Sequence, residues 1–229
     1  NWTASHDSRI TNEGYIQFPA YYHCSDFDER ISGEVAVSST VIANAYWVGS
    51  GINGTQTLVP GTNEDSNSYV KLSTTSTASS TSILTFGRYV KSVNQGCVEF
   101  RFYISSKTNT CFKLGLYYDS THYFYINFDS TVNANNLYFE SYNGSSSASV
   151  NTNQSISTGN WYKLRIYNYP SSYKVYLNDI LLNVGTQYFN VTGLKPYIYI
   201  DNKSSSAEKI IYIDYVKIWT GRDDTSGVS

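Results

Sequence analysis

Charged side chains are scarce in this 229-residue chain, since Asp, Glu, Lys and Arg make up 15% of it and the net charge is −2. Without an excess of Lys and Arg the chain lacks the basic surface that nucleic-acid binding needs, so no nucleic-acid partner is expected. Long apolar runs are also missing. No stretch approaches the roughly 20 apolar residues of a transmembrane helix, so no membrane span is expected. Ser, Thr, Asn and 23 Tyr supply the polarity instead, and tyrosine favours strands and amphipathic surfaces.

Methionine is absent altogether, even at position 1. We interpret the chain as a processed mature form or a fragment, with a removed signal peptide as the simplest explanation. We therefore expect it outside the cell, or on a cell or virion surface. Six Asn-x-Ser/Thr triplets fit that location; they begin at Asn1, Asn53, Asn143, Asn153, Asn190 and Asn202. Because the chain is so rich in Asn, Ser and Thr that several triplets would arise by chance, their occupancy by glycans stays open.

Cysteine occurs three times, at Cys24, Cys97 and Cys111. No pair has the Cys-x-x-Cys spacing of a zinc site, and the three histidines are scattered. We expect Cys97 and Cys111 on one face of a hairpin but several residues out of register, which excludes a bridge between them. Two arrangements remain open: a bridge from Cys24 to one of the other two, or three separate buried thiols.

Three runs with alternating apolar residues follow one another between Gly96 and Asp129. The apolar side chains stand at every second position in 98–104, 112–118 and 124–128, which predicts strands with one buried face. The joints between the runs are short and polar, as in hairpins. We therefore predict an antiparallel meander in the middle of one sheet.

Shorter runs of the same kind fill most of the remaining chain, and no apolar pattern has a helical period. We expect further strands at 35–37, 41–48, 69–72, 82–86, 137–142, 161–167, 173–178, 180–182, 188–191, 197–201 and 210–219. Residues 49–68 and 143–154 are expected to be loops, and the Ser/Thr-rich residues 73–81 a turn. More than ten strands without a helix predict an all-β sandwich.

No change of composition or linker divides the chain. We predict one β-sandwich domain over residues 1–229, in which residues 1–22 form an N-terminal arm or edge strand. Pro19 within the aromatic run of residues 14–23 argues against a central strand there. Residues 220–229 are expected to form a polar tail.

Three stretches have a recognisable order and spacing: Gly96–Ile104 (GCVEFRFYI), Asn160–Leu182 (NWYKLRIYNYPSSYKVYLNDILL) and Ile211–Trp219 (IYIDYVKIW). They resemble the concanavalin A-like lectin and glucanase superfamily, including its laminin G-like branch. In the second, Asp179 and Ile180 stand where the family usually has Gly. The resemblance spans about residues 82–219 and implies an antiparallel jelly-roll β-sandwich of two curved sheets.

The resembled glucanases carry Glu-x-Asp-x-x-Glu on one strand, and the lyases carry Gln-x-His with an Arg-rich strand. Neither pattern is present: Arg101 follows Glu99, and Glu140 stands alone between Phe139 and Ser141. A retaining glycosidase needs two carboxyl groups about 5–5.5 Å apart. We therefore expect a protein that is not an enzyme, with glycoside hydrolase or polysaccharide lyase as the least favoured function.

Tyrosines on the strand faces opposite the core are the best candidates for a binding surface. They are Tyr103, Tyr117, Tyr123, Tyr125, Tyr138 and Tyr142. On a curved sheet they could line one concave surface, where rings stack on sugars and hydroxyls bond sugar hydroxyls. The same residue type is enriched in protein–protein contacts.

Two functions are therefore compared. The first is an extracellular, non-catalytic structural subunit of a surface layer, filament or virion, which associates with itself or another surface protein. The aromatic run of residues 14–22 could then add to a neighbouring sheet edge. The alternative is a secreted, lectin-like carbohydrate-binding module. The composition, poor in charge and rich in Ser, Thr, Asn and Tyr, suits an external coat and makes the structural subunit the first hypothesis.

The resemblance also implies a structural Ca²⁺ between the start of the fold and an aspartate on its closing strand. Asp214 matches that aspartate, and Asp26 and Asp28 are the early oxygen donors that Ca²⁺ would prefer. The alternative is that Asp214 faces solvent or pairs with Lys217 or Arg30.

Overall fold

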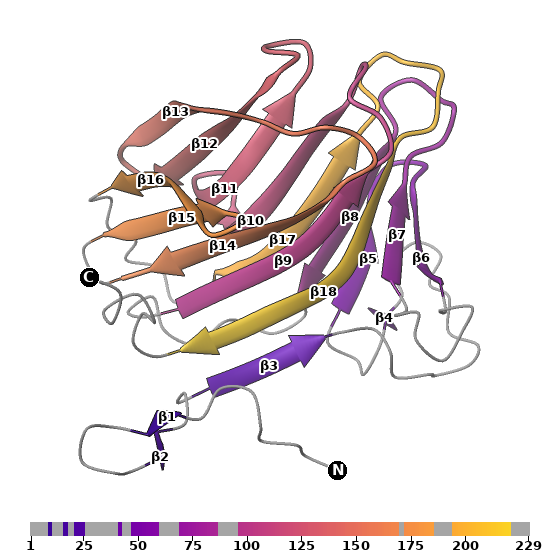
Figure 1. Cartoon of the computed structure of the whole chain (residues 1–229). Coiled ribbons are helices and arrows are strands. Elements are labelled where there is room, and N and C mark those ends of the chain that lie inside the picture. The colour runs from indigo at the N-terminus through magenta and orange to yellow at the C-terminus, as the bar shows by residue number, and fades with distance from the viewer. Residues whose placement is uncertain are drawn as a thin grey trace.

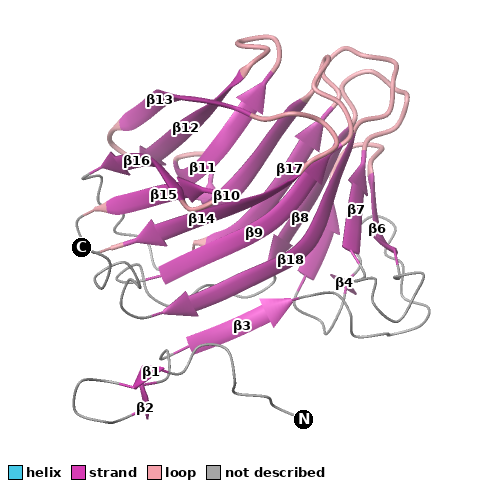
Figure 2. Ribbon diagram, in the orientation of Figure 1, coloured by secondary structure: helices cyan, strands magenta, loops and turns pink. Residues whose placement is uncertain are grey.

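The computed structural model describes residues 9–10, 16–17, 21–25, 41–42, 47–59, 69–86, 96–169, 172–185 and 194–220. These residues form strands and loops and no helix (Figure 2). The strands are β1 (Arg9–Ile10), β2 (Ile16–Gln17), β3 (Tyr21–Ser25), β4 (Val41–Ile42), β5 (Trp47–Ser50), β6 (Thr55–Val59), β7 (Tyr69–Ser73), β8 (Thr81–Phe86), β9 (Gly96–Ile104), β10 (Cys111–Asp119), β11 (His122–Asp129), β12 (Asn136–Asn143), β13 (Ser147–Ser155), β14 (Trp161–Asn168), β15 (Tyr173–Leu177), β16 (Ile180–Gly185), β17 (Lys195–Asp201) and β18 (Ile210–Thr220). No helix long and apolar enough to cross a membrane occurs in this part of the chain.

Sixteen of the strands build two antiparallel sheets that lie over each other (Figure 1). Sheet I has the order β13-β12-β11-β10-β17-β8-β5-β4. Sheet II has the order β16-β15-β14-β9-β18-β7-β6, and β3 pairs with β18 beyond the end of β7. In Figure 1 the strands of sheet II pass in front of those of sheet I. The prediction of an all-β sandwich is confirmed.

The core lies between the two sheets because every second side chain of the long strands points toward the opposite sheet. Phe102 of sheet II meets Phe112 of sheet I with ring centroids 5.8 Å apart, and Phe139 stacks on Tyr173 at 4.5 Å. The apolar positions predicted for strands 98–104, 112–118 and 124–128 are buried, except for Tyr118, which is 46% exposed and lies where the register of β10 against β11 shifts. The period of two therefore identified the inward face of these strands correctly.

The predicted meander is wrong at its first joint. Strand β9 pairs with β14 and β18 in sheet II, whereas β10 pairs with β11 and β17 in sheet I. The connection 105–110 therefore crosses from one sheet to the other instead of closing a hairpin. Alternation shows which face of a strand is buried, but both sheets bury the same kind of face, so it does not identify the neighbouring strand.

Two expected loops contain strands. Residues 55–59 form β6, and residues 147–155 form β13, whose side chains are mostly exposed. Both are edge strands of their sheets. A strand that buries little shows no apolar alternation, so its sequence reads as a loop.

The amino-terminal arm is partly described. Tyr21 and Tyr22 of β3 pair with Thr220 and Trp219 of β18, so this end of the aromatic run joins a sheet of its own chain. The expected strands at 35–37 and 188–191 and the tail beyond Thr220 lie outside the described residues.

Cys97 and Cys111 are buried thiols. They lie on β9 and β10, hence in opposite sheets, so they do not share the face of one hairpin as expected. Burial raises the pKa of the Cys111 thiol to about 12, which keeps it protonated and unreactive. The alternative of separate buried thiols is confirmed for these two, while the side chain of Cys24 lies outside the described residues.

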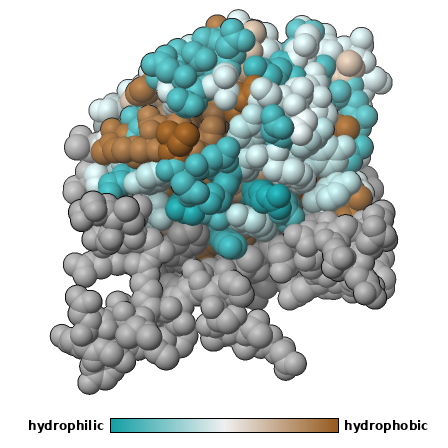
Figure 3. Space-filling model, in the orientation of Figure 1, coloured by the Kyte–Doolittle hydropathy of each residue, from teal (hydrophilic) through white to brown (hydrophobic). Residues whose placement is uncertain are grey.

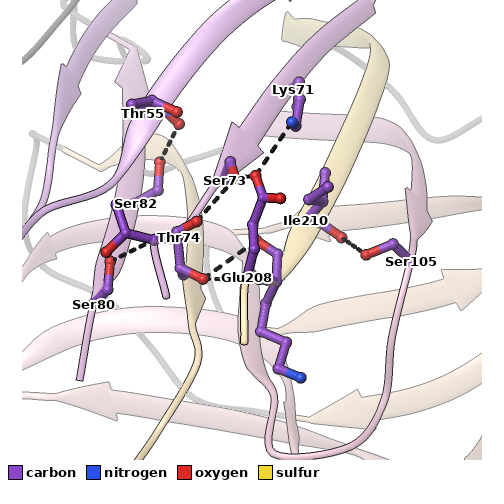
Figure 4. A network of polar contacts seen from close by, with 11 residues as sticks. Thr55, Lys71, Ser73, Thr74, Ser80, Ser82, Ser105, Glu208 and Ile210 are labelled. Atoms are coloured by element: carbon purple, nitrogen blue, oxygen red, sulfur yellow. Dashed lines mark hydrogen bonds and ion pairs between the residues drawn. The ribbon is translucent and has the colours of Figure 1, made fainter. Parts of the chain in front are cut away.

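The Ser/Thr-rich turn between β7 and β8 is held by hydroxyl and amide groups (Figure 4). The Ser82 hydroxyl donates to the carbonyl of Thr55 (2.8 Å), and the amide of Lys209 donates to the Thr74 hydroxyl (2.8 Å). Glu208 accepts from the Ser73 hydroxyl and from Lys71. These bonds join β6, β7 and β8 to the start of β18, which gives the many hydroxyl side chains of this region a structural role.

Candidate functional site

The outer face of sheet I carries five of the six tyrosines that were predicted to share one surface: Tyr117, Tyr123, Tyr125, Tyr138 and Tyr142. Sequence reasoning missed Tyr197 and Tyr199 of β17, which pair with Gly115 and Lys113 of β10 and so point the same way. Both alternate with buried isoleucines, so the period of two in residues 195–201 could have revealed them. We call these seven tyrosines the tyrosine face.

Tyr103 does not belong to the tyrosine face. It lies on the outer face of sheet II, where its ring is 5.6 Å from that of Trp161 and 5.3 Å from that of Tyr212. The prediction of one shared surface is therefore wrong for Tyr103, because β9 and β10 belong to opposite sheets.

The rings of the tyrosine face touch one another across four strands. Tyr123 stacks on Tyr125 with centroids 4.6 Å apart, and Tyr117 stacks on Tyr197 at 4.7 Å. A distance of 6.4 Å between Tyr125 and Tyr197 links the two pairs, and Tyr142 extends the contact onto β12. The result is a continuous aromatic surface over β17, β10, β11 and β12.

The centre of the tyrosine face is its most buried part. Tyr125 is 4% exposed and Tyr197 9%, while Tyr117, Tyr123 and Tyr142 around them are half-buried. Burial raises the pKa of Tyr125 and of Tyr197 well above the ordinary value. Their hydroxyls therefore stay neutral and keep both a donor and an acceptor function.

Polar groups stand between the rings. The ammonium of Lys113 donates to the Tyr125 hydroxyl (3.1 Å) and lies 5.5 Å from the ring centroid of Tyr199. On β12, the strand on the other side of Tyr125, the Glu140 carboxylate accepts from the amide of Asn127 (2.8 Å). The face thus offers a cationic donor and an anionic acceptor beside apolar ring surfaces, a combination typical of sites for small polar ligands.

Gly115 lies beneath the centre of this face, because it pairs with both Tyr125 and Tyr197. A Cβ at position 115 would clash with the carbonyl oxygen of Phe124 and would lie 2.5 Å from the Cα of Tyr125. Only glycine fits this close approach of two backbones. Because Gly115 has no side chain, the rings of Tyr125 and Tyr197 on the two neighbouring strands can approach each other above it.

No family model matches the chain, and no curated protein matches it in sequence. Solved structures do match. A chain solved among the endo-acting O-glycanases of the human gut microbiota has a TM-score of 0.61 at 11% identity, covering 87% of this chain and 99% of that one. The metal-free carbohydrate recognition domain of Emp46p has a TM-score of 0.58 at 12% identity, covering 78% and 90%. The chain therefore shares the fold of these structures, a jelly-roll β-sandwich.

A glycoside hydrolase family protein from Mycobacterium thermorestibile shares the jelly roll as well, with a TM-score of 0.59 at 12% identity over 86% of this chain and 99% of that one. At such identities the similarity extends to the fold alone. The expectation of a jelly-roll sandwich is confirmed.

Asp214 occupies an irregular position in the jelly roll. The register of β18 against β9 shifts between Ile213 and Tyr215, which turns both Asp214 and Tyr215 toward the outer face. There the buried carboxylate of Asp214 accepts a hydrogen bond from the Arg101 guanidinium. Its partner is therefore Arg101, which neither alternative from the sequence had named.

Calcium stays a prediction. Asp26 and Asp28 lie outside the described residues, and within the described part of the chain no three His, Cys, Asp or Glu side chains gather in a group that could hold a metal ion. The ion pair with Arg101 offsets the cost of burying the Asp214 carboxylate without a metal ion.

Glu99 also lies on the outer face of sheet II, where it is an ion-pair residue. Its Oε2 accepts from Nε of Arg165 (2.7 Å), and its Oε1 accepts from the hydroxyl of Tyr215 (2.9 Å). Both carboxylate oxygens are thus held by groups on the neighbouring strands β14 and β18.

The sequons differ in accessibility. Asn53 and Asn153 are exposed and Asn143 is half-buried, whereas Asn1 and Asn190 lie outside the described residues. Asn202 is fully buried, and its side-chain amide donates to the carbonyl oxygens of Thr75 and Thr77. The structure therefore contradicts a glycan on Asn202, because its nitrogen is enclosed and already engaged.

Proposed function

We propose that the protein is a non-catalytic, lectin-like carbohydrate-binding module that holds a glycan on the tyrosine face. The observation that carries this proposal is the continuous ring surface of Tyr117, Tyr123, Tyr125 and Tyr197 with Lys113 beside Tyr125. Apolar faces of sugar rings stack on such rings, while the neutral hydroxyls and the ammonium bond sugar hydroxyls.

The jelly-roll neighbours support this function over a structural subunit. They include a carbohydrate recognition domain and chains from glycan-degrading enzymes. The hypothesis of a structural subunit in a surface layer, filament or virion rests on composition, and no contact among the described residues adds support for it. An extracellular location fits both functions and stays a prediction.

The carboxylates of the tyrosine face support a binding role without catalysis. Glu140 has Tyr125 and Ser149 as its neighbours across the sheet, neither of which is acidic. A retaining hydrolase needs a second carboxyl group about 5–5.5 Å away. Incubation of a glycan that binds should therefore release no reducing ends, and product formation that disappears in Glu140→Gln would refute this part of the proposal.

Replacing Tyr117 by Ala is expected to weaken glycan binding about tenfold, which corresponds to ~1.4 kcal/mol. The substitution removes one stacking ring but leaves the core untouched, because Tyr117 lies on the outer face and is half-buried. The measurement is a screen of immobilised neutral and acidic polysaccharides, followed by titration calorimetry with those that bind.

Tyr103→Ala is the matched control, since Tyr103 is equally half-buried but lies on the outer face of sheet II. It should leave the Kd unchanged. Absence of binding to every glycan tested, or an equal loss in the two variants, would refute the tyrosine face as the binding site.

A further inference from the structure

The edge strand β16 exposes an apolar surface. Ile180 is 59% exposed, Leu181 49% and Val184 53%, and Figure 3 shows the brown patch over β15 and β16. Leu181 and Val184 pair with Tyr176 and Lys174 of β15, so both point to the outer face of sheet II. The register shift of the β15–β16 pair brings these two side chains to the same face although three positions separate them.

β16 also lacks the features that normally protect a sheet edge. It is the last strand of sheet II, so among the described strands only β15 bonds to it. Its sequence, ILLNVG, contains no charged residue and no proline, which are the usual means of preventing edge-to-edge pairing. One edge strand of sheet I, β13, also lacks charge and proline, but its sequence SASVNTNQS is polar. An apolar, uncharged edge is a template for another strand.

We propose that two copies of the chain pair along β16 and join their sheets II into one continuous antiparallel sheet. A second copy fits because the strand is complementary to itself. With a twofold axis between Leu182 and Asn183, Leu181 of each copy lies opposite Val184 of the other on the outer face. The extra residue in the strand occurs in both copies, so the irregular backbones match.

The pairing gives hydrogen-bond partners to the backbone N–H and C=O groups on the free edge of β16. It causes no charge repulsion at the twofold axis, because β16 contains no ionisable side chain. One six-residue strand buries less than the roughly 800 Å² per partner of a standard interface. The dimer is therefore weak and dissociates on dilution. It leaves the tyrosine face open, because that face belongs to sheet I, and two copies then present two such faces, which raises the avidity for a polymeric ligand.

Sedimentation velocity over a concentration series tests the dimer. The wild-type chain should change from monomer to dimer as the concentration rises. Leu181→Lys and Val184→Lys should each raise the dissociation constant of the dimer at least tenfold. Each substitution places one ammonium group per copy opposite an apolar side chain of the partner, so the dimer would contain two unpaired charges. Val132→Lys, at a 70% exposed position in the turn between β11 and β12, is the control and should leave it unchanged.

A cross-link tests the register. The double variant Leu181→Cys/Val184→Cys places opposite cysteines at the Cα separation that a disulfide requires, so a covalent dimer should form on oxidation. Leu181→Cys alone should cross-link poorly, since position 181 does not face itself. A chain that stays monomeric at all concentrations, a dimer that survives both lysine substitutions, or equal cross-linking of single and double variants would overturn the proposal.

Discussion

Arg165→Met is expected to lower the free energy of unfolding by about 3–5 kcal/mol, because it leaves a buried carboxylate without its cation. The side chain of Glu99 is 5% exposed, and Nη2 of Arg165 lies 2.6 Å from its Oε2. Burial alone lowers the pKa of Arg165, but the Glu99 carboxylate, together with Tyr167 and Cys97, more than offsets this and raises it. The guanidinium therefore stays charged beside the Glu99 carboxylate.

Urea unfolding followed by circular dichroism measures this effect, with two further variants as controls. The double variant Glu99→Gln/Arg165→Met should be more stable than Arg165→Met, since it removes the orphaned charge. Lys163→Met breaks the ion pair with Asp179, whose side chain is 60% exposed, and should cost at most about 1 kcal/mol. If Lys163→Met and Arg165→Met lowered the free energy of unfolding by similar amounts, the burial of Glu99 would not be the cause of the loss in Arg165→Met.

Asn202→Asp is expected to cost at least about 3 kcal/mol, although the two side chains have the same shape. The amide of Asn202 donates to the carbonyls of Thr75 (2.9 Å) and Thr77 (2.8 Å), and its Oδ1 accepts from the amide of Ser80 (2.9 Å). Aspartate retains the acceptor but has no N–H. A buried carboxylate would then face two carbonyl oxygens, and the turn between β7 and β8 would lose two of its hydrogen bonds to the segment 202–209.

Thermal and urea unfolding of Asn202→Asp and Asn153→Asp test this prediction. Asn153 also begins a sequon and has a positive φ of 55°, but it is exposed, so its substitution should change stability by less than about 0.5 kcal/mol. Material from a secretory host should carry no glycan at Asn202. Equal stability of the two variants, or a glycan on Asn202 in the folded protein, would contradict the burial of this side chain.

The sequence by itself determined the fold class and the inward face of the long strands. Phe100, Phe112 and Phe128 could be assigned to the core because a period of two has one physical explanation, a strand with one buried face. The turn at residues 73–81 was also predictable, since hydroxyl-rich segments compete for backbone hydrogen bonds. The aromatic surface of β10 to β12 followed from the same alternation, because the tyrosines fill the positions opposite the core.

Only the tertiary structure decided which strands are neighbours. A chain that alternates between two sheets shows the same pattern as one that folds back within a sheet, so the separation of Tyr103 from Tyr117 could not be predicted. Likewise, Asp214 meets Arg101 because a register shift turns its carboxylate outward. The position of β16 at a sheet edge, which exposes Leu181, depends on strand order. Such strand pairings join residues far apart in the chain. Their free energies depend on the side chains of the neighbouring strand, which the apolar alternation within one strand does not specify.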